Sequence, residues 1–369
     1  MINLKWKKQI LDLPSYKPGK SIDEVKREFG LEKIVKLASN ENPSGCSETV
    51  LQVVINNFPL LALYPDGYAT KLRTTLAQHV KVDLEQLIFG NGSDEVILII
   101  ARSLLLPGTN TVMPANTFPQ YKHNAIIEGA EVREISLIDG AHNLDGMLKA
   151  IDQNTKVVWL CSPNNPTGIH IPNELLLAFL DQVPKDVLVV LDEAYYEYVI
   201  ADDYYDSIKL ISRYSNLIVL RTFSKIYGLA SLRIGYGVSS PSIISALEPV
   251  REPFNVNTIA QMAATAAIED QAYVESCKLK NRQGLEQFYQ FCEMHQLNYY
   301  PSQGNFILID FNVQGNEVFQ YLLKKGYIVR SGNALGFPTS VRITVGSKEQ
   351  NEGVLSELSQ FLKLKATSR

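Results

Sequence analysis

Residues 222–235 read T-F-S-K-I-Y-G-L-A-S-L-R-I-G and directly follow Leu217–Leu220, an apolar, partly β-branched run typical of a buried strand. Lys225 therefore lies in the loop where that strand ends, a position at which burial can lower the pKa of an amine and make it a nucleophile. Three groups flank this lysine at a spacing that suits one phosphate: the hydroxyls of Thr222 and Ser224 and the guanidinium of Arg233. Lys225 is accordingly a candidate for carrying pyridoxal phosphate, although most lysines are solvated surface residues.

Length and composition indicate an ordinary globular protein. The 369 residues predict about two domains, and 46% hydrophobic with 20% charged residues provide enough apolar surface for a large core. A formal net charge of -4 and the lack of any basic run exclude a nucleic-acid-binding protein. No apolar run reaches a membrane span, and no signal-peptide core is present, so we expect a cytoplasmic protein. The cysteines form no C-x-x-C pair, which predicts reduced thiols and no metal site: Cys46, Cys161, Cys277 and Cys292.

The order of predicted elements indicates an α/β fold. Short strands alternate with amphipathic helices up to about residue 245, which predicts a mostly parallel central sheet with helices on both faces. We divide the chain into an N-terminal arm (1–40), a large cofactor-binding domain (41–248) and a smaller α+β C-terminal domain (249–369). The arm is expected to pack with the small domain or a partner subunit. Its G-K-S triplet at 19–21 is no phosphate loop, because proline stands at the first glycine position of that motif.

The segment G-N-G-S-D-E at 90–95 follows the predicted strand Leu87–Phe89 and opens an apolar helix. Glycines at this point let backbone N–H groups approach a phosphate at the positive end of the helix. A dinucleotide site would need glycine where Glu95 stands. Alternatively, Ser93 is merely an N-cap. Because the carboxylates of Asp94 and Glu95 would repel a phosphate unless they point away, a phosphate here should bind through backbone donors.

The next two strands also end in residues suited to a ligand. Thr111–Met113 precedes a loop with Phe118, whose ring can stack on a flat cofactor, although such an aromatic is more often part of the core. Val157–Leu160 precedes S-P-N-N-P-T-G, in which prolines on both sides hold Asn165 in a rigid turn. Rigidity at this place is useful if the asparagine side chain must be aimed.

Val187–Leu191 is a strongly apolar strand that ends in Asp192 and Tyr195. A carboxylate at such a strand end is costly to bury unpaired, so it has a cationic partner or faces a cleft. Carboxyl ends of parallel strands meet at one crevice, where ligands bind. Five successive strand ends then converge on one site: Ser93, Phe118, Asn165, Asp192 with Tyr195, and Lys225 with Arg233. This set matches pyridoxal phosphate, which needs a lysine, a carboxylate for its ring nitrogen and an anion cradle.

Two turn-rich segments supply weaker candidates. In L-A-S-N-E-N-P at 37–43, Asn40 and Asn42 are either turn formers or ligands. In Y-P-D-G-Y at 64–68, a turn explains the composition, although the hydroxyl of Tyr64 could reach an anion.

An ordered set of motifs over nearly the whole chain resembles the histidinol-phosphate aminotransferase family, within the fold-type I pyridoxal-phosphate-dependent aminotransferases. The motifs are Y-K-P-G-K at Tyr16, L-A-S-N-E-N-P at Leu37, Y-P-D at Tyr64, G-N-G-S-D-E at Gly90, S-P-N-N-P-T-G at Ser162, D-E-A-Y at Asp192, T-F-S-K at Thr222, L-R-I-G-Y at Leu232, P-F-N-V-N at Pro253, N-F at Asn305, G-Y-I-V-R at Gly326 and V-R-I-T-V-G at Val341. The chain departs from the family pattern at residues 44–46 and at Ile226, Ser231 and Ser331, and none of these departures removes a catalytic group.

The resemblance implies a role for each matching position. Lys225 would be the Schiff-base lysine and proton carrier, Asp192 the partner of the ring nitrogen, and Asn165 and Tyr195 the ligands of the ring hydroxyl. Phe118 would stack on the ring. The cofactor phosphate would be bound by Ser93, the Asp94 backbone, Thr222, Ser224 and Arg233, joined by Tyr64 from the second subunit of a homodimer.

The resemblance also implies substrate ligands near the C-terminus. Arg342 would bind the anionic group of the substrate and Arg330 the phosphate or the distal carboxylate of glutamate, with Tyr16 and Asn40 contributing. One guanidinium can take phosphate in one half-reaction and carboxylate in the other. Without the resemblance, an arginine in the V-R-I-T-V strand would be interpreted as an exposed ion-pair partner.

The implied reaction is reversible amino transfer between histidinol phosphate and 2-oxoglutarate, which forms imidazole-acetol phosphate and glutamate in histidine biosynthesis through a ping-pong cycle. Three alternatives remain open. They are an aromatic amino-acid aminotransferase on the same fold, a regulatory protein that binds pyridoxal phosphate without turnover, and a nucleotide-binding protein.

Overall fold

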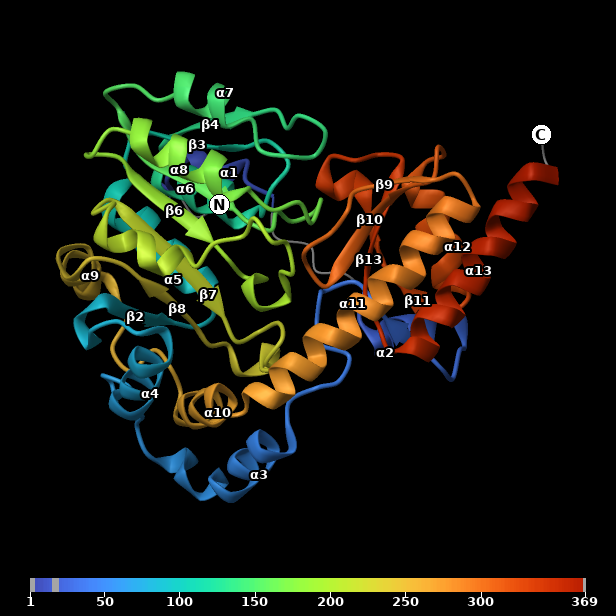
Figure 1. Ribbon diagram of the computed structural model, residues 1–369, viewed down its shortest axis with the longest axis horizontal. Helices are drawn as coiled ribbons and strands as arrows, with labels where there is room; N and C mark the ends of the chain where they lie inside the picture. Colours follow the sequence, from blue (N-terminus) through green and yellow to red (C-terminus); the bar gives the residue numbers. More distant parts are fainter. Residues whose placement is uncertain (1–3, 15–19, 368–369) are drawn as a thin grey trace.

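The computed structural model describes residues 4–14 and 20–367. Figure 1 shows a larger part around one sheet and a smaller part around another, with a long helix running between them. The strands are β1 (Val35–Lys36), β2 (Leu87–Gly90), β3 (Asn110–Pro114), β4 (Glu131–Ile135), β5 (Thr155–Cys161), β6 (Leu188–Asp192), β7 (Leu217–Thr222), β8 (Gly235–Val238), β9 (Asn298–Tyr299), β10 (Phe306–Asp310), β11 (Tyr327–Ile328), β12 (Arg330–Ser331) and β13 (Ser340–Thr344).

The α-helices of the described chain are α1 (Lys8–Leu11), α2 (Ile22–Phe29), α3 (Glu48–Asn56), α4 (Thr70–Val80), α5 (Ser93–Leu104), α6 (Gln120–Glu128), α7 (Leu144–Lys149), α8 (Asn173–Gln182), α9 (Pro241–Leu247), α10 (Thr258–Glu269), α11 (Gln271–Met294), α12 (Gly315–Lys324) and α13 (Lys348–Thr367). None of the helices in these described ranges is long and apolar enough to cross a membrane.

The larger sheet has seven strands in the order β2-β8-β7-β6-β5-β3-β4. β8 is antiparallel to both of its neighbours, whereas the other adjacent pairs are parallel. The predicted mostly parallel sheet is therefore confirmed. Because β2 and β7 flank the reversed strand β8, they run in the same direction, and the carboxyl ends of β2, β3, β5, β6 and β7 lie along one edge.

Helices cover both faces of this sheet, as predicted. Alternate residues of β6 enter different apolar clusters: Val189 and Leu191 pack with α4, α8 and α10, and Val190 packs with α5, α6 and α9. A strand that is buried on both faces has no polar face, which explains the unbroken V-L-V-V-L run.

The smaller part contains the antiparallel sheet β12-β13-β10-β9 and its own apolar cluster. The second half of the arm packs here, because β1 pairs with β11 and Val25 of α2 shares an apolar cluster with Ile328. The division at residue 248 stays a prediction of the sequence. In the structure, α10 and the first turns of α11 pack in the larger cluster, through Ala263 and Val274.

Candidate active site

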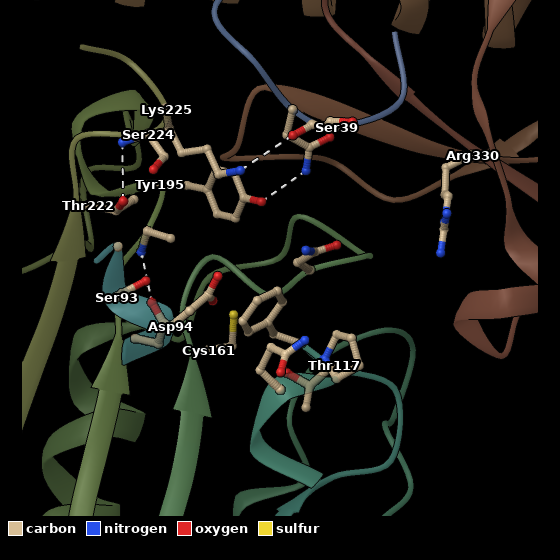
Figure 2. Close-up of a pocket in the computed structure, with 18 of the residues that line it drawn as sticks. Ser39, Ser93, Asp94, Thr117, Cys161, Tyr195, Thr222, Ser224, Lys225 and Arg330 are labelled. Carbon is tan, nitrogen blue, oxygen red and sulfur yellow. Dashed lines mark hydrogen bonds between the residues drawn. The ribbon is translucent and has the colours of Figure 1, made fainter. Parts of the chain in front are cut away.

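A cavity of about 590 Å³ lies at the carboxyl edge of the larger sheet, with one wall from the smaller part (Figure 2). The structure brings the following predicted site residues together in its lining: Asn40, Ser93, Asp94, Phe118, Asn165, Asp192, Tyr195, Thr222, Ser224, Lys225, Arg233, Arg330 and Arg342. Two predicted residues are not placed there. Tyr64 is absent from the lining, and Tyr16 lies outside the described residues.

One end of the cavity is an anion cradle built on the N-terminus of α5. Gly92 has a φ of +74°, and a Cβ at this position would come within 2.6 Å of Nη2 of Arg233. Only glycine therefore lets the guanidinium lie against the start of the helix. Ser93 is the first helical residue and Gly92 is the cap, without a side-chain capping bond, so the alternative that Ser93 is only an N-cap is wrong.

The two acidic residues of the cradle are turned away or neutralised. Oε2 of Glu95 accepts hydrogen bonds from the Asn91 backbone N–H at 2.6 Å and from Nδ2 of Asn255 at 2.7 Å. Asp94 lies 3.2 Å from Nη2 of Arg233. The repulsion expected from the sequence is thus offset by these contacts, and the helix amides remain suited to a phosphate.

The loop after β7 completes the cradle. The Ser224 backbone N–H donates to Oγ1 of Thr222 at 3.1 Å, and Nη1 of Arg233 donates to Oγ of Ser224 at 3.3 Å. Figure 2 shows Thr222 and Ser224 on the same side of the cavity as Ser93, with Arg330 across from them. Hydroxyl, guanidinium and helix-terminal N–H donors therefore meet at one end of the site.

Asp192 is a buried carboxylate at the end of β6. Oδ2 accepts a hydrogen bond from the hydroxyl of Tyr121 at 2.6 Å, and Oδ1 accepts one from the Ala194 N–H at 3.2 Å. Burial raises the pKa of Asp192 to about 6, and the Tyr121 hydrogen bond opposes that rise. Both donors are uncharged, so this carboxylate is suited to a cation that arrives with a ligand.

Lys225 reaches into the cavity from the loop after β7, and its Nζ donates to the Ser39 carbonyl at 3.4 Å. Burial, followed by the nearby charge of Arg342, lowers the pKa of Lys225 to about 8. An amine with this pKa is partly uncharged near neutral pH, which suits both attack on a carbonyl and proton transfer.

Asn40 and Tyr195 form the wall beside the lysine. Asn40 has a φ of +56°, and its Nδ2 donates to the hydroxyl of Tyr195 at 2.9 Å. The turn and ligand interpretations of Asn40 are therefore compatible, since the strained backbone aims the amide into the site. Burial raises the pKa of Tyr195, so the phenol keeps its proton.

Arg342 comes from β13 of the smaller part and spans the gap to the larger part. Its Nη1 donates to Oδ1 of Asn165 at 2.5 Å and its Nη2 donates to the Ala38 carbonyl at 2.7 Å. The residue is only 7% exposed, so the interpretation as an exposed ion-pair partner is wrong. Arg330 lies opposite Arg342 in the β12–β13 pairing and also lines the cavity. Two guanidinium groups thus provide a second anion site.

Sequence reasoning gave no role to Tyr121. This fully buried ring stacks on Trp159 with a centroid separation of 4.9 Å and an interplanar angle of 11°. Nε1 of Trp159 in turn donates to Oγ1 of Thr111 at 2.7 Å. Tyr121 is therefore a positioning residue for Asp192. In the sequence it is only the second aromatic residue after β3, three residues beyond Phe118; in the structure the two rings meet edge-on.

The residues present fit pyridoxal phosphate. The test is the donor set itself: an amine with a lowered pKa, a buried carboxylate with uncharged partners, and an anion cradle at a helix N-terminus lie around one cavity. Phe118 also lines this cavity, in a position that supplies an aromatic face. Lys225 would hold the aldehyde carbon, Asp192 the ring nitrogen, and the cradle the phosphate.

Comparisons with known proteins agree with this geometry. The family profile described as aminotransferase class I and II matches residues 32–358. A histidinol-phosphate aminotransferase of Geobacillus sp. (strain WCH70) is 62% identical over 359 residues, covering 97% of this chain and 98% of that protein. A histidinol-phosphate aminotransferase of Bacillus subtilis (strain 168) is 60% identical over 357 residues, covering 96% of this chain and 99% of that protein.

A solved structure gives the same match in three dimensions. The histidinol-phosphate aminotransferase of Sinorhizobium meliloti, crystallised in complex with pyridoxal-5'-phosphate, superposes with a TM-score of 0.89 at 26% identity. The superposition covers 97% of this chain and 98% of that one. An aspartate aminotransferase of Thermus thermophilus, at 20% identity and a TM-score of 0.84, shows the likeness of fold alone.

Proposed function

Because the chain belongs to the class I and II aminotransferase family, we propose that it transfers an amino group between histidinol phosphate and 2-oxoglutarate with pyridoxal phosphate as the cofactor. The observation that carries this proposal is the pair of anion sites on opposite sides of one lysine. The helix α5 cradle takes the cofactor phosphate, and Arg342 with Arg330 takes the substrate anion.

Each catalytic group acts on a defined atom. When bound, pyridoxal phosphate supplies a ring that withdraws the electron pair of the bond broken at the substrate carbon. Asp192 would hold the ring nitrogen in its protonated form, because its carboxylate lines the cavity and its two hydrogen-bond donors are uncharged. The amine of Lys225, whose pKa is lowered to about 8, would remove the proton from the substrate carbon and hold it for return to the aldehyde carbon of the cofactor. Tyr195 and Asn165 hold the ring hydroxyl.

Arg342 accounts for the use of two chemically different substrates. Histidinol phosphate has no α-carboxylate, so a planar guanidinium must accept phosphate in one half-reaction and carboxylate in the other. The hydrogen bonds of Arg342 to Asn165 and the Ala38 carbonyl fix the plane of this fork relative to the cofactor site. Substrate orientation therefore depends on a residue that joins the two parts of the chain.

The experiment compares kcat/KM for imidazole-acetol phosphate and phenylpyruvate, with glutamate as the amino donor. A clear preference for imidazole-acetol phosphate is expected. Preference for phenylpyruvate would instead identify an aromatic amino-acid aminotransferase. If glutamate left the absorbance spectrum of the bound cofactor unchanged, the protein would be a regulator that binds the cofactor without turnover.

The homodimer with shared sites belongs to the same proposal. Tyr64 is 84% exposed, stacks on Phe254 at 5.0 Å, and lies on a surface that carries several other exposed apolar side chains: Leu51, Ile55, Phe58, Leu61, Leu63 and Tyr68. A concentration of exposed apolar side chains within one short stretch of the chain, residues 51–68, supports a protein interface there. Lys225→Ala and Tyr64→Ala chains, each impaired alone, should recover activity when mixed and refolded together; no recovery would contradict sharing in trans. A cytoplasmic location likewise stays a prediction of the sequence.

A further inference from the structure

A second cavity, of about 510 Å³, lies next to the loop that carries Lys225 and shares no lining residue with the first cavity. The segment 39–44 separates them, because Ser39 and Asn40 line the first cavity and Asn42 and Ser44 line the second. The other walls come from α11 and from the turn between β13 and α13. Its volume falls within the range of about 300–1,000 Å³ that is typical of small-molecule sites.

The lining has an apolar interior and a positive rim. Val345 and Tyr198 are buried, and Lys280 and Lys348 are exposed at the edge. Of the described residues that line the cavity, none is Asp or Glu. Lys348 also begins α13, whose N-terminal end favours a negative charge. The carboxylate of Glu352 lies 3.9 Å from Lys348, but both side chains of this pair are mostly exposed, so it neutralises the rim only weakly.

The polar groups deeper in the cavity are held in fixed positions. Nδ2 of Asn281 donates to the Gly304 carbonyl at 3.0 Å, and Nδ2 of Asn351 donates to Oε1 of Gln287 at 3.0 Å. A wall of this kind is preformed, so a ligand would not have to order it on binding.

The second cavity is connected to the lysine loop by short contacts. Nδ2 of Asn42, a wall residue, donates to the carbonyl of Ile226 at 2.6 Å, and Nζ of Lys225 donates to the carbonyl of Ser39 at 3.4 Å. The segment 39–44 therefore touches the lysine loop at two points. The walls also join the two parts of the chain, because Cys277 belongs to the larger apolar cluster and Val345 to the smaller one.

We propose that the second cavity is an effector site for a small molecule with an apolar body and one carboxylate or phosphate group, and that its occupant restrains the segment 39–44 against Lys225. The apolar body lies against Val345 and Tyr198, and the anionic group meets Lys280 and Lys348. A ligand shifts a conformational equilibrium only by its difference in affinity for the two states, so the occupant acts if it binds this arrangement of the two parts more tightly than others.

The binding test uses cofactor-loaded protein saturated with 2-oxoglutarate, which occupies the substrate anion site of the first cavity, and isothermal titration calorimetry with 3-phenylpropionate and phenyl phosphate. The two probes share a ring and differ in the anion. Benzyl alcohol is the neutral control. We expect one anionic probe to bind once per chain, about tenfold or more tightly than the alcohol, because the rim charge contributes. The stronger of the two probes identifies the anion class. Absence of binding by both anionic probes at millimolar concentration would overturn the proposal.

Three variants assign the probe to a cavity. The double variant Lys280→Glu/Lys348→Glu reverses the rim charge and should weaken binding at least about tenfold. Lys363→Glu reverses a single charge on exposed α13 surface outside the lining and should leave binding unchanged. Arg330→Gln, in the first cavity, should also leave it unchanged. Loss of binding in Arg330→Gln, or survival in the double variant, would place the probe elsewhere and overturn the assignment.

Coupling to the active site has its own readout. The bound probe should change the KM for glutamate by about fivefold or more in the wild-type and Lys363→Glu proteins, a typical size for coupled sites, and not in the double variant. A probe that binds with no change in KM would overturn the coupling. The binding measurement does not require turnover, so it separates this proposal from the proposed transaminase activity.

Discussion

Asp192 and Glu193 are consecutive residues, and both are almost completely buried, yet they meet different partners. Glu193 accepts hydrogen bonds from Nε of Arg221 at 3.0 Å and from the hydroxyl of Tyr204 at 2.7 Å, and its Oε2 lies 2.9 Å from Nη2 of Arg221. Asp192 accepts only hydroxyl and amide hydrogen bonds among the contacts described above. One carboxylate has a permanent cation and the other faces a cavity.

The difference separates a structural acid from a functional one. A buried carboxylate without an ionic partner disfavours its charged form, and burial accordingly raises the pKa of Asp192 to about 6. The charges of Asp94 and Glu193 act in the same direction. Under the proposed function, the protonated ring nitrogen of the cofactor would supply the missing cation. Glu193 instead joins β6 to β7 through Arg221 and needs no ligand.

The largest expected effect is that of Asp192→Asn on turnover. The substitution keeps the size of the side chain and removes the charge opposite the ring nitrogen, so kcat/KM should fall on the order of 10³-fold. Steady-state kinetics and cofactor titration followed by absorbance measure this loss. Glu193→Gln, the neighbouring control, should lose activity only as far as its folded fraction falls. If kcat/KM of Asp192→Asn stayed within tenfold of wild type, the assignment of Asp192 as the functional acid and Glu193 as the structural one would be contradicted.

The second effect is that of Glu193→Gln on stability. The free energy of unfolding should fall by about 3–5 kcal/mol, because the buried guanidinium of Arg221 loses its nearest ionic partner and keeps only the carboxylate of Asp206, 3.6 Å away. Urea denaturation measures the change. Asp181→Asn, which breaks the exposed pair with Arg213, should have a much smaller effect. Equal changes in the two variants would show that the burial of the Glu193 pair has no energetic consequence.

The third effect is that of Tyr121→Phe on cofactor affinity. Loss of a hydrogen bond to a charged group should weaken binding about tenfold. The Tyr121 hydroxyl lowers the pKa of Asp192, so without it the pKa rises and the carboxylate protonates more readily. The deficit should therefore be largest near pH 6 and shrink above pH 8, where Asp192 is ionised in both proteins. Titration of the cofactor-free protein at both pH values tests this, and a ratio independent of pH would indicate a purely structural role.

The smallest effect is on the stability of the cofactor-free protein. The pKa of Asp192 is higher in the folded chain than its ordinary value of 3.8, so ionisation favours unfolding; this penalty is fully present above pH 6 and is lost as the pH falls toward 4. Cofactor-free Asp192→Asn should be more stable than wild type by about 1–2 kcal/mol at pH 8 and equal to it near pH 4. Denaturant titrations at both pH values measure the difference. A variant less stable than wild type at pH 8 would contradict the assignment of an unpaired carboxylate.

The sequence predicted the sheet edge well, because Ser93, Asn165, Asp192 and Lys225 lie at or shortly after the ends of apolar strands. Asp192 ends β6, and the loop with Lys225 follows β7. Short apolar, β-branched runs are typical of strands that are buried on both faces of a parallel sheet. Parallel strands place their carboxyl ends along the same edge of the sheet. Local pattern and tertiary position therefore coincide in this part of the chain.

Contacts made by helix orientation could not be predicted in the same way. The Tyr121 hydroxyl reaches Asp192 only because α6 packs against β5 through Trp159, and a single aromatic residue carries no sign of this. The second cavity was even less predictable from the sequence. Its walls come from segments as far apart as Asn42 and Asn351, so no local pattern describes it.

The most direct test of the whole account is borohydride reduction of the protein loaded with pyridoxal phosphate, followed by mass-spectrometric mapping of the labelled peptide. The account predicts one pyridoxyl group per chain, attached to Nζ of Lys225, and no label in Lys225→Ala. A label on another lysine, or none in the wild-type protein, would contradict the assignment of the cofactor to the edge of the larger sheet.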